Sequence, residues 1–205
     1  MVILPDWLSV ASTQSGRLPS VARRSVDGRI MNRSIVHDID AGACAVAVGA
    51  VDLRAPHVGS GLVICVSDGV DVGGMAHVLA SAELPAFGMH RPGFFVGSAL
   101  PGLLQLLRGA GARRGLRAAL IGGASARTAV PDTCALRTLE AARLLCEKYY
   151  VPIVDEFTGG SHVREVVFDG YGTVTVTTCL QTTSVTLRDA RSSVKKFTLQ
   201  PAVIT

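Results

Sequence analysis

The chain has 205 residues, of which 48% are hydrophobic, and its 20 Lys and Arg residues against 16 Asp and Glu residues give a formal net charge of +4. This length and composition allow one domain of ordinary size with a full core. The basic residues are scattered and are not interleaved with aromatic residues, which argues against nucleic acid as a partner, because that function needs a dense basic face.

The cysteines and the apolar runs bear on the cellular compartment. Five cysteines are an odd number, and they form no C-x-x-C pair and no Cys/His metal pattern. We therefore expect unpaired thiols in a reducing cytoplasm, no metal site and no cofactor. The longest apolar stretch, residues 41–51, has about half of the ~20 residues that cross a bilayer, so no membrane insertion is expected. The cysteines are Cys44, Cys65, Cys134, Cys146 and Cys179.

The first part of the chain predicts mainly strands. Residues 1–40 have little periodicity and predict an N-terminal extension with room for one short strand. Residues 45–54 (AVAVGAVDLR) are rich in valine and predict a single strand buried on both faces. Residues 62–67 and 75–80 predict two more strands, and the Asp68-Gly69 turn that follows the first of them indicates a hairpin.

Two segments carry apolar residues at helical spacing. Four leucines between residues 103 and 107 fall on one broad face, with Pro101 near the first turn and Gly109 at the end. This pattern predicts a helix packed on a sheet. Residues 135–149 show helical spacing again and predict a second helix, and residues 116–121 predict a strand between the two.

The rest of the chain predicts strands, because short β-branched runs alternate with turn residues such as Asp169-Gly170. Two helices against mixed or antiparallel sheets predict an α/β layered domain. We expect this domain to cover residues 41–178 and residues 179–205 to be a C-terminal extension with strands packed on the same domain. The strands are predicted at residues 153–154, 166–168 and 173–176, with edge strands at 184–187 and 197–204.

Several segments agree, in order and in type, with one known family. They are residues 48–53 (VGAVDL), 73–79 (GGMAHVL), 122–124 (GGA) and 151–160 (VPIVDEFTGG), followed by Arg164. Over roughly residues 46–177 the chain resembles the CheD family, the chemoreceptor glutamine deamidases of bacterial chemotaxis. The resemblance implies a CheD-like layered domain with mixed or antiparallel sheets and two main helices.

The resemblance also implies a site. In the family, a cysteine attacks the side-chain amide, a histidine activates the thiol and protonates the departing ammonia, and a threonine lies nearby. His77 takes the position of this histidine and is the candidate base and acid. Aligning Gly59-Ser60 with the family's Gly-Ser places Gly61 where the cysteine should be, 16 positions before His77. The threonine has no counterpart in this alignment.

Two other residues are candidate nucleophiles. Cys65 lies only 12 positions before His77 and in the middle of a predicted strand, where apolar burial would raise the pKa of its thiol and suppress the thiolate. Ser60 could act as a hydroxyl nucleophile, but a serine needs a base held by a third group, and the sequence assigns no such acid.

The favoured hypothesis is a CheD-like protein that has lost deamidase chemistry and acts by binding in chemotaxis or signalling. Its partners would be chemoreceptor cytoplasmic helices or a CheC-like phosphatase. The alternative is an active protein-glutamine deamidase, a hydrolase that releases ammonia with a Cys65/His77 pair. A third possibility is a scaffold recruited to another deamidase or to an assembly outside chemotaxis, because one fold commonly hosts several functions.

Overall fold

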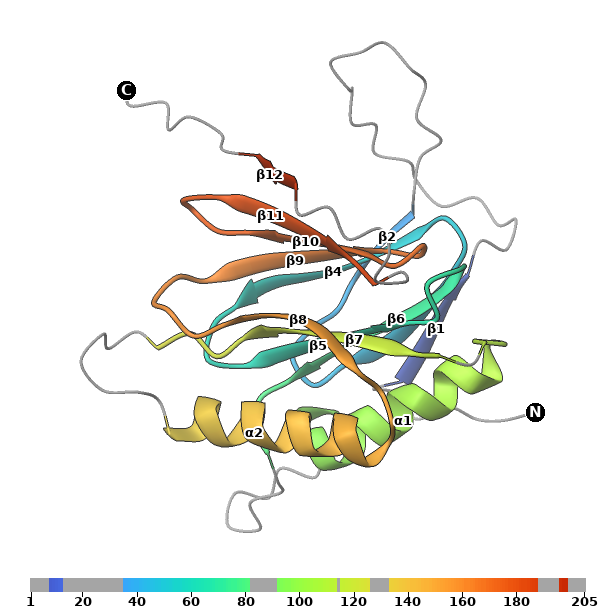
Figure 1. The fold of residues 1–205 in the computed structure, drawn as a ribbon, viewed down its shortest axis with the longest axis horizontal. Coiled ribbons are helices and arrows are strands. Elements are labelled where there is room, and N and C mark those ends of the chain that lie inside the picture. The colour runs from blue at the N-terminus through green and yellow to red at the C-terminus, as the bar shows by residue number, and fades with distance from the viewer. Residues whose placement is uncertain are drawn as a thin grey trace.

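The computed structural model describes residues 8–12, 35–81, 92–113, 115–125, 133–187 and 196–198. Two six-stranded sheets pack face to face, and the helices α1 (Val96–Gly109) and α2 (Thr133–Lys148) cover the outer face of the first sheet (Figure 1). The layered α/β architecture with two main helices is thus confirmed. Neither helix combines the length and the apolar character that spanning a bilayer requires.

The first sheet is mixed. Its strands β1 and β3 run parallel, β7 and β8 run parallel, and the pairs between them are antiparallel. In spatial order they are β1 (Leu8–Ser12), β3 (Cys44–Val48), β6 (Val72–Val78), β5 (Leu62–Ser67), β7 (Arg117–Gly122) and β8 (Ile153–Thr158).

The second sheet is antiparallel except for the parallel pair of β2 and β4. The turn at Asp169, predicted from Asp169-Gly170, joins β9 to β10, and its carboxylate accepts hydrogen bonds from the backbone N–H groups of Tyr171 and Thr173. In spatial order the strands are β12 (Lys196–Thr198), β11 (Thr182–Thr186), β10 (Thr173–Thr177), β9 (Arg164–Asp169), β4 (Val51–Val58) and β2 (Ile35–Asp38).

The β5–β6 hairpin, confirmed in register from Leu62 opposite Val78 to Ser67 opposite Gly73, lies in the middle of the first sheet. Side chains alternate along it, so that Ile64 packs under the helices while Cys65 packs between the sheets. Both faces of the hairpin are therefore buried.

Two glycines of the GGMAH segment owe their identity to packing. A Cβ on Gly73 would lie 2.2 Å from Cζ of Phe168 in the second sheet, and a Cβ on Gly74 would lie 2.7 Å from Cδ1 of Leu103 in α1. The two residues face opposite layers, so their missing side chains let the sheet partner and the helix approach the same strand. This part of the motif is explained by structure alone.

Two predicted boundaries are wrong. The single strand expected at residues 45–54 is two strands in different sheets, because Gly49 takes a φ of 72° and turns the chain between β3 and β4. Pro101 lies inside α1, which begins five residues earlier at Val96. Because a proline has no backbone N–H, Pro101 leaves the carbonyl oxygen of Gly97 without its usual intrahelical hydrogen bond, and the helix continues past it.

The two expected extensions contribute strands to the sheets. From residues 1–40, β1 pairs with β3 in the first sheet and β2 pairs with β4 in the second. From residues 179–205, β11 and β12 continue the second sheet to its edge. The remainder of the edge strand predicted at 197–204 lies outside the described residues.

Candidate functional site

The candidate site lies at one end of the β5–β6 hairpin, where β5 begins and β6 and β7 end. The segment that leads into β5 is laid against the residues that follow β7. The backbone N–H of Gly123 donates to Gly61 O at 2.8 Å, and that of Ala124 donates to Gly59 O at 2.9 Å. Gly122 has a φ of 135°, and a Cβ there would lie 2.2 Å from Gly61 O, so only glycine fits this approach.

Gly61 faces the imidazole of His77. A Cβ built on Gly61 would lie 3.4 Å from His77 Nε2, which is the direction a side chain would need in order to meet the ring. The same Cβ would lie 2.9 Å from the carbonyl oxygen of Val78 and 3.0 Å from Cδ2 of Leu79. The backbone has therefore closed around a position that carries no side chain.

His77 is a buried residue with an unused ring nitrogen. Its relative exposure is 5%, and its Nδ1 atom has no hydrogen-bond partner among the described residues. Burial lowers the pKa of His77, while the backbone of Ile39 and the charge of Asp40 act in the opposite direction. The neutral imidazole is favoured at neutral pH, so the ring can accept a proton or a hydrogen bond.

Among the described residues, no hydrogen bond joins Cys65 to this imidazole. Cys65 lies opposite Met75 on the paired strand, two residues before His77, and such diagonal neighbours are about 7–8 Å apart. Its side chain is fully buried between the sheets, and burial raises the pKa of its thiol far above the ordinary value. Burial thus disfavours the thiolate that Cys65 would need as a nucleophile.

Ser60 is exposed in the loop before β5, and within the described stretch around it its hydroxyl forms no hydrogen bond. Among the described residues, no hydrogen bond links Ser60 to a base or to an orienting acid. Its role as a nucleophile stays a prediction.

The remaining thiols differ in exposure. Burial raises the pKa of Cys44 to about 12, and burial together with the charge of Glu156 raises that of Cys146 to about 11. Cys134 is exposed on the first turn of α2, with its Sγ 4.0 Å from the carbonyl oxygen of Leu79. Cys134 therefore lies close to the end of β6. The sequence analysis did not predict this proximity. The predicted order of a strand ending near residue 122 and a helix following it could have indicated that the start of the helix lies at this end of the sheet.

Arg164 braces the loops around the site. Its guanidinium donates to the carbonyl oxygens of Gly159 at 2.5 Å, His162 at 3.4 Å and Gly122 at 3.5 Å. The desolvation that accompanies these contacts lowers the pKa of Arg164. Because Gly122 in turn abuts Gly61, this arginine helps to fix the backbone that faces His77.

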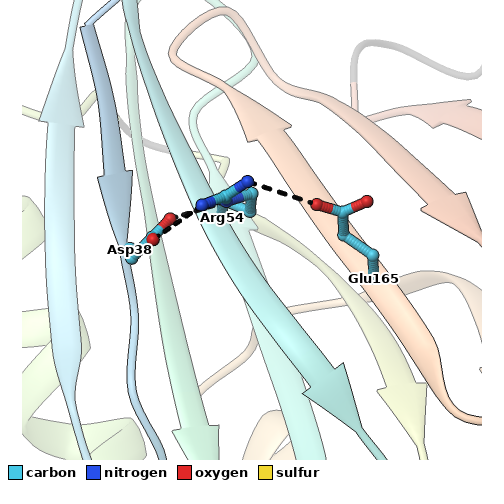
Figure 2. A network of polar contacts seen from close by, with 3 residues as sticks. All are labelled: Asp38, Arg54 and Glu165. Atoms are coloured by element: carbon cyan, nitrogen blue, oxygen red, sulfur yellow. Dashed lines mark hydrogen bonds and ion pairs between the residues drawn. The ribbon is translucent and has the colours of Figure 1, made fainter.

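A hollow of about 590 Å³ lies on the second sheet at the same end of the molecule. Arg54 forms ion pairs there: Figure 2 shows its guanidinium between the carboxylates of Asp38, at 2.6 Å, and Glu165, at 3.6 Å. Within the described residues, neither here nor elsewhere do three His, Cys, Asp or Glu side chains gather closely enough to hold a metal ion. The hollow is lined by Asp38, Arg54, Pro56, His57, Val163, Arg164, Glu165 and Thr177, and so excludes Gly61 and His77.

Comparison with known proteins points in one direction. A family model described as CheD chemotactic sensory transduction matches residues 79–178. A probable chemoreceptor glutamine deamidase CheD of Methanosarcina barkeri (strain Fusaro / DSM 804) is 28% identical over 130 residues, which are 62% of this chain and 86% of that protein. The range matched by the family model begins just after His77 and leaves out Gly61 and Cys65.

Proposed function

We propose that this chain is a CheD-like protein that binds a chemoreceptor or a CheC-like phosphatase and does not deamidate it. The single observation that carries the proposal is the position of Gly61, whose missing side chain points at His77 Nε2. Deamidation by a cysteine enzyme needs a thiolate at the amide carbon and a base beside it. In this chain the residue that faces the candidate base His77 is Gly61, which has no nucleophilic atom.

The partner class comes from the similarity to CheD proteins, one of which is named a probable chemoreceptor glutamine deamidase. The described site has a feature of a binding site, because a neutral imidazole whose Nε2 faces position 61 can accept a hydrogen bond from a donor such as a side-chain amide. A bound amide would then be held without being hydrolysed.

The direct test combines binding with mass spectrometry. The chain is incubated with purified chemoreceptor cytoplasmic helices and, separately, with a CheC-like protein, and we expect a complex with at least one of them and no deamidated glutamine. Ser60→Arg, at the exposed rim of the site, should weaken that complex at least tenfold. Gln105→Arg, equally exposed but on α1, is the matched control and should leave it unchanged.

Glutamine deamidation with release of ammonia, abolished by Cys65→Ser, would contradict the proposal and support the active Cys65/His77 enzyme. Absence of binding to both partners would contradict the chemotactic role and support a scaffold recruited elsewhere.

A further inference from the structure

A second cavity, of about 370 Å³, lies at the opposite end of the β5–β6 hairpin from Gly61. The carboxylate of Asp68, in the turn of that hairpin, accepts a hydrogen bond from the backbone N–H of Arg113 at the cavity wall. Residues at or just after the C-terminal ends of α1 and α2, which lie toward the same side of the molecule in Figure 1, line it together. The lining residues are Arg108, Ala112, Arg113, Gly115, Leu116, Tyr149, Tyr150 and Val151.

The residues that line this cavity carry positive charge. Its lining includes two exposed arginines, Arg108 and Arg113, and no carboxylate. Among the described residues neither guanidinium forms an ion pair, whereas Arg54 in the larger hollow is held between two carboxylates. Two unneutralised guanidinium groups around one hollow attract an anion, and their planar forks match phosphate and carboxylate groups.

Helix capping does not account for both arginines. Arg108 is in the last turn of α1, where a positive charge complements the helix dipole. The carbonyl oxygens of residues 106–108 are nevertheless already satisfied by the backbone N–H groups of residues 110–112. Arg113 lies beyond the helix, so its placement beside the same cavity needs another explanation.

Tyr150 is presented to solvent at a conformational cost. It has a φ of 57°, the left-handed region that normally selects glycine at the end of a helix, and its relative exposure is 92%. The hydrogen bonds that end α2 run from Tyr150 N to Glu147 O and from Val151 N to Cys146 O, and a glycine would make the same bonds. Packing does not require the ring. Beside it, the Lys148 ammonium lies 5.8 Å from the centroid of Tyr149.

We propose that this cavity binds a small anionic ligand that carries both a phosphoryl group and a flat ring, the chemistry of a nucleoside phosphate. Arg108 and Arg113 would take the phosphoryl oxygens, and the exposed ring of Tyr150 would stack on the flat part of the ligand. A small ligand fits better than nucleic acid or a membrane because the charge is confined to one hollow and does not form an extended basic stripe. The proposal is independent of the role assigned to Gly61 and His77.

Isothermal titration calorimetry of the full chain with ADP, inorganic phosphate and adenosine tests this proposal. We expect saturable one-to-one binding of ADP in 0.15 M salt (about physiological ionic strength), weaker binding of phosphate and none of adenosine. The double variant Arg108→Gln/Arg113→Gln should weaken ADP binding at least tenfold. Arg54→Gln, in the larger hollow, is the matched control and should leave the affinity unchanged.

Tyr150→Gly separates recognition from folding. Glycine removes the ring and relieves the left-handed backbone, so the variant should melt at a higher temperature and yet bind ADP severalfold more weakly, with phosphate binding unchanged. Failure of ADP to bind, ADP binding retained in the double arginine variant, or an ADP affinity untouched by Tyr150→Gly would overturn the proposal. Binding of an oligonucleotide or of anionic vesicles in place of ADP would overturn it as well.

Discussion

The polar groups at the two ends of the β5–β6 hairpin differ in whether their hydrogen-bonding capacity is satisfied. At the turn, the Asp68 carboxylate accepts hydrogen bonds from four backbone N–H groups, those of Val70, Asp71, Val72 and Arg113. At the other end, His77 keeps a buried nitrogen without a partner among the described residues. Buried polar groups in native proteins are normally satisfied. The turn therefore has the arrangement of a structural element, whereas the His77 end leaves a buried polar atom unsatisfied.

The largest effect expected at the His77 end comes from Gly122→Ala. The new Cβ would meet Gly61 O at 2.2 Å and would occupy a backbone with a φ of 135°, so we expect a loss of roughly 3 kcal/mol or more in the free energy of unfolding. Urea denaturation measures this loss. Gly111→Ala is the control, because Gly111 also has a positive φ, of 89°, but nothing lies within 4 Å of its Cβ. It should lose about 1 kcal/mol. Equal losses would show that the close approach to Gly61 is absent.

At the turn, Asp68→Ala should cost about 2 kcal/mol at pH 7, because it leaves several backbone donors without an acceptor. Burial acts to raise the pKa of Asp68, but the four N–H groups outweigh it and lower the pKa below the ordinary 3.8. The stabilisation is thus fully present above pH 3.8 and is lost as the pH falls through the lower folded value. The difference between wild type and variant, measured by denaturation at pH 7 and pH 2.5, should shrink at the lower pH. A constant difference would contradict an ionised Asp68 as the cause.

Gly61→Cys would sharpen the comparison by returning a thiol to the His77 end. The contact of its Cβ with Val78 O should destabilise the chain by about 1 kcal/mol, as a mild case of overpacking. Beside His77 Nε2 the thiol should be alkylated by iodoacetamide about tenfold faster than in Gly61→Cys/His77→Ala, because the imidazole takes up its proton. Peptide mass spectrometry distinguishes residue 61 from the exposed Cys134 and Cys179. Identical rates with and without His77 would contradict the observed direction of position 61.

The smallest effect is the pH dependence contributed by His77. Burial lowers its pKa below 6.5, so the folded state binds fewer protons than the unfolded state. The stabilisation contributed by neutral His77 is therefore fully present above pH 6.5, and it is lost as the pH falls through the lower folded pKa. His77→Gln should remove this decline, which chemical denaturation at pH 7.5 and pH 5 would detect. An unchanged pH profile in the variant would show that His77 is not the group responsible.

Local patterns predicted much of the fold because they coincide with local causes. Helical spacing located both helices, and Asp68-Gly69 and Asp169-Gly170 located two turns whose aspartates accept backbone hydrogen bonds. The break at Gly49 was missed because a glycine inside a valine-rich run is compatible with a continuous strand. Only the separation of β3 and β4 into two sheets requires the turn.

The candidate site was predictable in part. The spacing between Gly61 and His77 suits a hairpin, and the register of β5 and β6 then brings the two positions together. The lowered pKa of His77 was not predictable, because it comes mainly from burial in the folded protein and is only partly opposed by Ile39 and Asp40, which precede the segment that resembles CheD. Arg108 and Arg113 were read as scattered basic residues, because the cavity that they share with Tyr150 forms only when the segments after two helices come together.

The pairing of β1 with β3 and of β2 with β4 has a practical consequence for work with shortened chains. A chain that begins at residue 41 would lack β1 and β2, which both come from the first 38 residues, and would therefore leave β3 and β4 as unpaired edges of their sheets. Uncovered margins of this kind recruit strands from other molecules. Trimming the amino terminus should therefore yield self-associating material, and the full chain is the form in which binding should be measured.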